Sequence, residues 1–268
     1  MARVTAPRKN EPAPIEVRGL RKVFRQATTG QSVIAIDRLD LRIEPREVVA
    51  IVGQTGCGKS TFFDLMIGLE RPSEGAILIG DKTPYGDFDY FRGRMATVFQ
   101  QDRLLPWRSS YDNVRLPLEL MGIAEAVQRE RSMRWLERLG LAGFINAYPH
   151  ELSGGMRQRV AIARAFVLQP DLLLADEAFG HLDEVTAAEL RETFLALARE
   201  TGSTAILITH QLEEAIGIGD RIVVLGKSAK LLSDIHVAQW PKAEYGSLRE
   251  AIQTTLQNNQ PDARLTRR

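Results

Sequence analysis

The sequence predicts an α/β fold in which helices alternate with the strands of a largely parallel sheet. Short apolar runs typical of buried strands recur along the chain, and segments with helical periodicity separate them. One such run, Val48–Val52, leads directly into the glycine-rich stretch Gly53–Thr61, which has the form G-x-x-x-x-G-K-S/T. Strands that are joined through helices run parallel to one another, so this alternation favours an α/β sheet.

The individual elements follow from apolar spacing. Strands are expected at Ile15–Arg18, Val33–Ile43, Val48–Val52, Ala76–Ile79, Met95–Phe99, Leu172–Ala175, Thr204–Thr209 and Arg221–Leu225. Helices are expected at about residues 59–68, 113–140, 187–199 and 211–216. Between these elements the chain shows no internal repeat.

A block of helical periodicity interrupts the strand pattern at about residues 102–164. Within it Met133, Leu136 and Leu139 recur at three-residue steps, and Glu130 precedes Arg134 by four positions, as in a helix. This block predicts a helical subdomain inserted into the sheet.

The two ends differ from the main part of the chain. The main domain is expected at residues 15–240. Residues 1–14 are rich in proline and charge and are expected to be disordered. Residues 241–268 are short and polar and are expected to form a C-terminal tail, with one possible helix at Leu248–Leu256.

Composition excludes several classes of protein. Lys and Arg number 35 and Asp and Glu number 34, so the overall charge gives no indication of a nucleic-acid partner. A single cysteine, Cys57, excludes an internal disulfide framework and is expected to pack as a small neutral residue. No apolar run approaches the ~18 residues that span a bilayer, and the first residues lack the apolar core of a signal peptide. We therefore expect a soluble intracellular protein that reaches a membrane only through a partner.

The glycine-rich stretch has the chemistry of a phosphate-binding loop (P-loop). Its glycines let backbone N–H groups point inward at an anion, and the helix that follows adds a partial positive charge at its N-terminus. Lys59 supplies a full charge for the β- and γ-phosphates, and Ser60 supplies a hydroxyl for Mg²⁺. The residues expected to bind nucleotide here are Gly53, Gln54, Thr55, Gly56, Cys57, Gly58, Lys59, Ser60 and Thr61.

Two carboxylates follow the apolar run 172–175. The carboxyl ends of parallel strands form the edge where α/β sheets bind ligands, so Asp176 and Glu177 are expected at that edge. Asp176 would hold Mg²⁺ through water, and Glu177 would orient or deprotonate the attacking water. An ordinary acidic loop after a core strand is the alternative.

A second glycine motif stands at Leu152–Val160. Ser153, Gly154 and Gly155 open an amphipathic helix, which makes a second anion site with free N–H groups at its start. Taken alone, such a sequence also suits a common helix-capping loop.

Together these motifs resemble those of the ATP-binding subunits of ABC transporters, and the resemblance covers about residues 15–240. It implies a P-loop NTPase (RecA-like) core with an antiparallel β subdomain and an inserted α-helical subdomain. It also implies that Phe24 stacks on adenine, that Gln100 reaches Mg²⁺ and that His210 lies near the γ-phosphate. Gly180–Asp183 corresponds to the family's D-loop, which adds Asp183 to the nucleotide-binding residues.

Some positions depart from the common family pattern. Met156 stands where Gln is frequent, Ala178 where Pro is usual after the catalytic Glu, and Arg46 in a turn that usually has Gly. None of these changes removes a group that binds phosphate, metal or water. An active ATPase that uses ATP and Mg²⁺, with Glu177, His210, Lys59 and Gln100 in catalysis, is therefore expected.

The resemblance further implies a dimeric mechanism. In this family ATP is bound between the P-loop of one subunit and the signature of another, so Ser153, Gly154 and Gly155 would complete the site of a second ATPase subunit. A homodimer bound to integral-membrane permease subunits is expected. Leu104–Trp107, an apolar run beside Gln100, is expected to face the permease.

The stretch Phe99–Trp107, with the motifs at 152–156 and 176–183, resembles the nitrate/sulfonate/taurine branch of bacterial importers. This implies uptake of a small anion such as nitrate, an alkanesulfonate, taurine or bicarbonate, delivered by a solute-binding protein, with the chain peripheral on the cytoplasmic face of the inner membrane. The alternatives are an importer of another small molecule, an exporter's ATPase subunit, a soluble non-transport ABC protein and a pure binding module.

Overall fold

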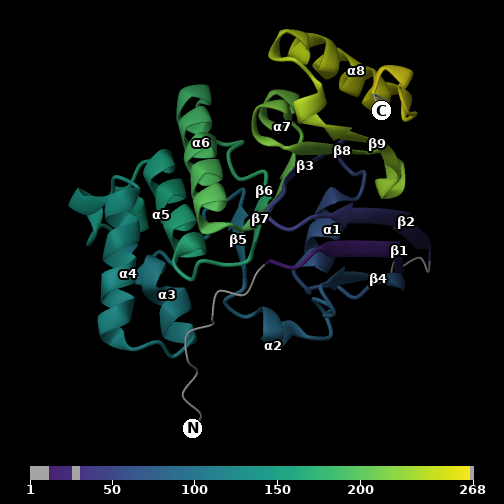
Figure 1. Ribbon diagram of the computed structural model, residues 1–268. Coiled ribbons are helices and arrows are strands. Elements are labelled where there is room, and N and C mark those ends of the chain that lie inside the picture. Colours follow the sequence, from purple (N-terminus) through teal and green to yellow (C-terminus); the bar gives the residue numbers. More distant parts are fainter. Residues whose placement is uncertain (1–11, 26–30, 266–268) are drawn as a thin grey trace. The chain divides into compact units, whose positions relative to one another are not determined.

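The computed structural model describes residues 12–25 and 31–265 (Figure 1). The described residues fall into two units, one of residues 12 and 92–203 and the other of those within 13–91 and 204–265. Most of the N-terminal segment that is expected to be disordered, residues 1–11, lies outside the described residues.

The unit of residues 13–91 and 204–265 contains an antiparallel sheet. Its strands β1 (Ile15–Arg25), β2 (Ser32–Ile43) and β4 (Glu74–Ile79) lie in the order β2-β1-β4. Ile15 pairs with Ile43 on one side and with Ile79 on the other, and all three side chains are buried. The expected antiparallel β subdomain is confirmed.

The same unit contains parallel strands around the P-loop. Strand β3 (Val48–Gly53) pairs in parallel with β7 (Thr204–Thr209) and with β8 (Arg221–Leu225). Every residue of these three strands is buried, which explains why they appear in the sequence as continuous apolar runs. Helix α1 (Lys59–Met66) follows β3, and α7 (Leu212–Ile218) follows β7.

One strand in this unit was not expected from the sequence. Strand β9 (Leu231–His236) pairs antiparallel with β8. Its burial alternates irregularly, with Leu232 and Ile235 buried, so it lacks both the continuous apolar run and the regular alternation by which the other strands are predicted.

The unit of residues 92–203 combines two parallel strands with a helical block. Strand β5 (Met95–Phe99) pairs with β6 (Leu172–Asp176). The helices are α3 (Ser110–Leu120), α4 (Glu125–Arg138), α5 (Gly154–Phe166) and α6 (Glu184–Thr201). Their core contains aromatic rings in contact, in which the ring centroid of Phe166 lies 5.5 Å from those of Trp135 and Phe194. The inserted helical block is confirmed.

The stretch 113–140 that is expected to be helical forms two helices, α3 and α4, with a turn between them. Gly122 in that turn has a φ of 66°, a left-handed conformation that ends a right-handed helix.

The described part of the chain also contains shorter elements. They are α2 (Phe88–Phe91) and the 3₁₀ turns Ala142–Phe144, Pro149–Glu151, Lys227–Ala229, Val237–Gln239, Lys242–Glu244 and Ala263–Leu265.

The segment expected to be a polar tail forms helix α8 (Tyr245–Asn258), which lies over α7 and strands β8 and β9 in Figure 1. One face of α8 is apolar, and its residues Leu248, Ala251 and Ile252 are fully buried. They belong to a cluster that includes Val224 of β8 and Ile235 of β9. The helix is therefore part of the hydrophobic core of its unit and not a projecting tail.

Replacing Ile252 with Ala tests this packing. Loss of a fully buried branched side chain is expected to lower the free energy of unfolding by about 2–5 kcal/mol, which urea denaturation measures. The neighbouring exposed residue supplies the control, and Gln253→Ala is expected to change the free energy by less than about 0.5 kcal/mol. Equal effects of the two substitutions would mean that α8 does not contribute to the core.

Candidate nucleotide site

The P-loop joins β3 to α1, and two of its glycines are required by close backbone approaches. A Cβ atom at Gly53 would lie 2.7 Å from the carbonyl oxygen of Leu225, at the end of β8. A Cβ atom at Gly58 would lie 2.4 Å from the carbonyl oxygen of Ala35 in β2. Gly58 also has a φ of 114°, a backbone conformation that residues other than glycine rarely adopt. The neighbouring strands thus hold the loop at both of its ends.

The start of α1 fits a phosphate group. No side chain caps this helix, so its first N–H groups remain available to an anion. Lys59 is only 7% exposed, and its Nζ donates hydrogen bonds to the carbonyl oxygens of Gly53 (2.7 Å) and Gln54 (3.1 Å). The ammonium group therefore lies against the loop whose N–H groups would bind the phosphates. These features fit the triphosphate of ATP.

Cys57 is the buried member of the loop. Burial raises the pKa of its thiol, so the side chain is neutral at physiological pH. Gln54, Thr55, Gly56 and Ser60 are exposed, whereas Thr61 is half-buried. The loop therefore has a buried base and an open outer surface.

His210 emerges at the same sheet edge as the P-loop. Val52 of β3 pairs in register with Thr209 of β7, so the residues that follow these two strands leave the sheet side by side. The Thr209 hydroxyl hydrogen-bonds to the carboxylate of Glu214 and accepts a hydrogen bond from the N–H of Gln211 (3.0 Å). Glu214 is buried in the first turn of α7, and nothing in the sequence motif indicated this support for the His210 segment.

Phe24, the predicted adenine-stacking residue, lies at the end of β1 and is 38% exposed. The Nζ atom of Lys22 lies 4.7 Å from the centroid of its ring and donates a 2.6 Å hydrogen bond to Glu70. An exposed ring held beside a paired lysine has the surface that stacking on a base requires.

In the other unit, the structure brings Gln100 and Glu177 together. Phe99 pairs with Asp176 in register, so the next residue of each strand emerges at the same edge. The Nε2 of Gln100 donates a 3.3 Å hydrogen bond to Oε2 of Glu177. Glu177 has a φ of 46°, a left-handed conformation that costs on the order of 1 kcal/mol or more in a non-glycine residue. Such a cost is typical of a functional position.

The second glycine motif starts helix α5. The Ser153 hydroxyl accepts a 3.3 Å hydrogen bond from the N–H of Met156, so this serine is the N-cap of the helix. A Cβ atom at Gly155 would lie 2.8 Å from Cγ2 of Thr186, in the first turn of α6. Glycine at this position is therefore required by the close approach of α5 to α6.

Asp183 is the N-cap of α6. Its carboxylate accepts a 3.0 Å hydrogen bond from the N–H of Thr186, and this bond lowers the pKa of the carboxyl group. The structure therefore shows a capping role for Asp183, and its predicted contact with nucleotide stays a prediction.

Three residues that were not singled out in the sequence connect α5 to the segments that carry Gln100 and Glu177. The buried Gln158 donates a 2.6 Å hydrogen bond from Nε2 to the carbonyl oxygen of Ala178. Arg157 donates a 3.0 Å hydrogen bond to Asp102, and Arg164 donates hydrogen bonds to the carbonyl oxygens of Asp102 and Arg103. Burial lowers the pKa of Arg164 from its very high ordinary value. The apolar periodicity of the sequence does not predict these hydrogen bonds, because their partners lie 20 or more positions apart.

Ser60, Gln100 and Asp176 are the predicted Mg²⁺ ligands. Each carries an oxygen donor, the kind of ligand that Mg²⁺ prefers. Asp176 is the last residue of β6, and Ser60 lies in the first turn of α1. Each residue therefore has donor chemistry that suits Mg²⁺, and their joint binding of one ion stays a prediction.

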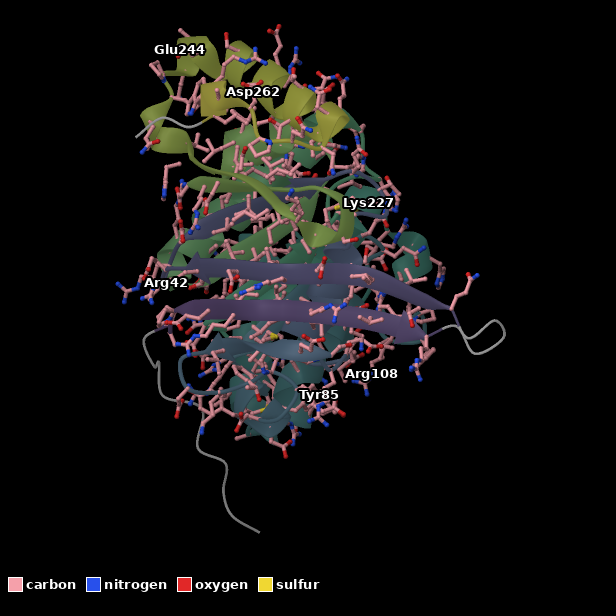
Figure 2. All side chains as sticks on the ribbon, turned by 90° about the vertical axis from the view of Figure 1, so that its right-hand side faces the viewer. Arg42, Tyr85, Arg108, Lys227, Glu244 and Asp262 are labelled. Atoms are coloured by element: carbon pink, nitrogen blue, oxygen red, sulfur yellow. The ribbon has the colours of Figure 1, made fainter. Side chains whose placement is uncertain are left out.

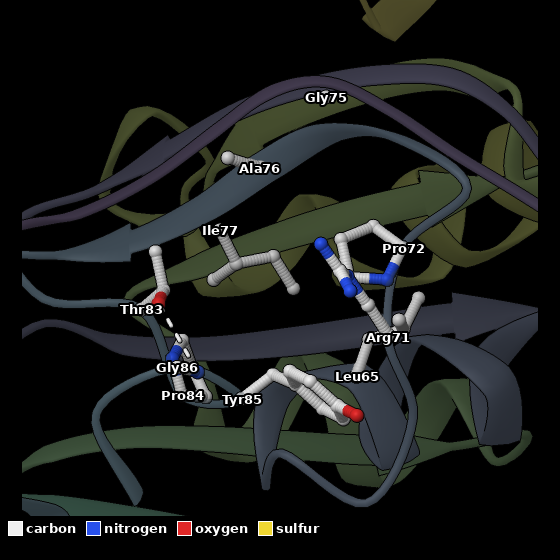
Figure 3. Close-up of a pocket in the computed structure, with 10 residues that line it drawn as sticks. All are labelled: Leu65, Arg71, Pro72, Gly75, Ala76, Ile77, Thr83, Pro84, Tyr85 and Gly86. Carbon is white, nitrogen blue, oxygen red and sulfur yellow. Dashed lines mark hydrogen bonds between the residues drawn. The ribbon is translucent and has the colours of Figure 1, made fainter.

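A separate cavity of about 370 Å³ lies beside β4 (Figure 3). It is largely apolar, and the guanidinium of Arg71 lies 5.8 Å from the centroid of the Tyr85 ring. None of its lining residues belongs to the predicted site, so the cavity is not assigned to nucleotide binding.

The fold and the P-loop define this protein as a P-loop NTPase. The family model described as ABC transporter matches residues 36–180, and the chain belongs to that family. It is thus an ATPase of the ABC type, and the predicted fold class is confirmed.

Several known proteins are similar to this chain. The taurine import ATP-binding protein of Rhizobium johnstonii is 40% identical over 206 residues, which are 76% of each chain. The aliphatic sulfonates import ATP-binding protein of Albidiferax ferrireducens is 41% identical over 222 residues, covering 83% of this chain and 73% of that one. An ATP-binding cassette solved as a dimer in a post-hydrolysis state with ADP and Pi has a TM-score of 0.74 and 30% identity, with coverage of 83% and 98%.

The bond from Gln158 to Ala178 yields a stability prediction. Gln158→Ala leaves a buried carbonyl oxygen without its donor, and the free energy of unfolding is expected to fall by about 1–3 kcal/mol in urea denaturation. Arg159→Ala is the control. It breaks a pair with the exposed Glu189 and a long 3.4 Å hydrogen bond to the carbonyl oxygen of Leu139, and it is expected to cost less than about 1 kcal/mol. An unchanged midpoint for Gln158→Ala would show that this bond does not stabilise the unit.

Proposed function

We propose that this chain is the ATP-hydrolysing subunit of a bacterial importer for a small anion of the sulfonate or taurine type. The proposal is supported by the names of the relatives that are about 40% identical to it, which are taurine and aliphatic sulfonate import ATP-binding proteins. The observation that carries the ATPase part is the P-loop, with glycines at the two close backbone approaches and Lys59 against the loop.

In the proposed reaction, residues of this chain bind the phosphates of ATP and activate the attacking water. Lys59 and the first N–H groups of α1 bind the β- and γ-phosphates and stabilise the charge that develops on them. Glu177, held by Gln100, orients the attacking water and accepts its proton. Ser60, Asp176 and Gln100 would hold Mg²⁺, which neutralises phosphate charge when it is bound.

The signature motif is proposed to act on a second subunit. Ser153 is exposed, and Gly154 and Gly155 are half-buried at the start of α5, so their N–H groups can reach a ligand outside this chain. ATP between the P-loop of one subunit and the signature of the other would join a homodimer, and hydrolysis would release it. The dimeric ATP-binding cassette with a TM-score of 0.74 supports this proposal.

The segment after Gln100 is proposed to face the permease. Trp107 is 71% exposed, a large apolar surface, whereas Leu104 of the same run is buried and so is not available to a partner. Among the described residues, none of the helices has the length and apolar composition needed to cross a bilayer. Attachment through permease subunits would place the chain on the cytoplasmic face of the inner membrane. A solute-binding protein would be only an indirect partner of the chain, through the permease.

Replacing Glu177 with Gln tests the catalytic assignment. The neutral amide cannot accept the water's proton, so the ATPase rate is expected to fall by about 100-fold or more while ATP binding is retained. An ATP-bound dimer is expected to accumulate in size-exclusion chromatography. The exposed Glu192→Gln is the control and should hydrolyse ATP normally. Undiminished phosphate release from Glu177→Gln would overturn the assignment.

Replacing Trp107 with Ala tests the permease surface. Removal of a large exposed ring from the interface is expected to lower the fraction of the chain recovered with membranes when it is co-expressed with its permease subunits, by about 10-fold. Leu120, which is 67% exposed at the end of α3, provides the matched control through Leu120→Ala. Equal recovery of the Trp107 variant and the unmodified chain would argue against this surface.

A further inference from the structure

The C-terminal end of α8 contacts the P-loop directly. The side-chain Nε2 of Gln54 donates a 2.9 Å hydrogen bond to the carbonyl oxygen of Leu256. Helix α8 ends at Asn258, so this carbonyl is one of the last four, which have no N–H partner within a helix. The second residue of the P-loop thus donates to a helix end that needs a donor.

Asn259, the residue after α8, forms a second connection. It adopts a left-handed conformation with a φ of 51°, and its Oδ1 accepts a 2.9 Å hydrogen bond from the N–H of Lys227. A Cβ atom at Gly226 would lie 2.3 Å from this Oδ1, so glycine at 226 is what lets the asparagine approach. Lys227, labelled in Figure 2, belongs to the short segment that follows β8.

That segment continues the connection to the other side of the P-loop. The N–H of Ala229 donates a 2.6 Å hydrogen bond to the carbonyl oxygen of Cys57. Ser228 and Ala229 both have left-handed φ angles, 54° and 53°, which the surrounding contacts must hold in place. The loop is therefore linked to α8 both at Gln54 and, through residues 226–229, at Cys57.

Only a few hydrogen bonds connect α8 to the P-loop, whereas the apolar face of α8 is packed in the core of its unit. Leu248 and Ile252 are fully buried, so the helix is a fixed support. A cavity of about 360 Å³ lies between residues 54–57 of the loop and residues 256, 257 and 259. Since this space is not filled by side chains, the hydrogen bonds and not packing connect the helix end to the loop.

We propose that the end of α8 holds the P-loop in its phosphate-binding conformation, with Asn259 and Gln54 as positioning residues for ATP. The inference rests on the proposed role of the P-loop in binding ATP. The exposed residues 54–56 have little packing of their own, so a loop without these links would lose more conformational freedom when ATP orders it. The links stabilise the free loop in the bound conformation and thereby raise the affinity for ATP.

Asn259→Gly in the full chain tests this inference, because glycine tolerates the left-handed backbone and removes the side chain that carries the acceptor oxygen. The dissociation constant for ATP, measured by titration calorimetry, and the KM are expected to rise about 3- to 10-fold, which is the effect of losing one hydrogen bond. The kcat should stay within about twofold, because bound ATP orders the loop in either protein. Asn259→Asp retains an acceptor and should restore most of the affinity.

Two further variants separate positioning from mere stability. The exposed Gln257 lines the same cavity, and within the described part of the chain no side-chain hydrogen bond joins it to the loop. Gln257→Ala should therefore leave ATP affinity unchanged. Gln54→Ala should also weaken ATP binding. Gln54 and Asn259 act on the same loop. The double variant that combines Gln54→Ala with Asn259→Gly should therefore weaken ATP binding by a factor different from the product of the two single effects.

The inference is overturned if Asn259→Gly and Gln54→Ala both bind ATP as tightly as the unmodified chain, even where their melting temperatures fall. A different variant tests the underlying assignment of the P-loop to ATP binding. Lys59→Ala is expected to lose ATP binding, and retention of binding by that variant would overturn the P-loop assignment together with this inference.

Discussion

Close backbone packing around the P-loop is the constraint on which the nucleotide site depends. A phosphate cradle requires N–H groups that point inward at fixed positions. Here the carbonyl oxygens of Leu225 and Ala35 come so near to Gly53 and Gly58 that a Cβ atom would fit at neither position. The glycines of the motif therefore serve two needs at once, since they free the N–H groups for phosphate and allow neighbouring strands to fix the loop.

A comparable constraint acts on Glu177, the proposed catalytic carboxylate. Glu177 is held in a left-handed conformation at the end of β6, where Gln100 donates to its side chain. The next residue accepts a hydrogen bond from Gln158 of the signature helix. The same helix begins at Ser153, so one buried amide joins the helix of the proposed signature to the segment beside Glu177.

The C-terminal helix extends the support of the P-loop beyond the motif itself. Its apolar face fixes it on β8 and β9. Its last turn presents the carbonyl oxygen of Leu256, which has no partner within the helix, and the side chain of Asn259 follows directly after it. Helix ends always leave such backbone groups to be satisfied elsewhere. In this chain the P-loop residue Gln54 satisfies one of them, which links the far end of the sequence to the nucleotide site.

The sequence by itself determined the central strands and the chemical motifs, because both are local. Val48–Gly53 is buried along its whole length and therefore appears as an unbroken apolar run, and the P-loop residues are contiguous. The sequence alone could not determine the turn at Gly122, the irregular strand β9 or the packing of α8. These features depend on burial and backbone geometry that apolar spacing does not encode.

Only the tertiary structure decided which distant residues support the site. Gln54 bonds to Leu256 across 202 positions, and Gln100 bonds to Glu177 across 77. It also showed that Asp183 caps α6. A hydrogen bond between distant segments leaves no periodic signal in the sequence, because its partners are brought together by the pairing of strands and the packing of helices. Local patterns therefore predicted the chemistry, and the fold determined the geometry that supports it.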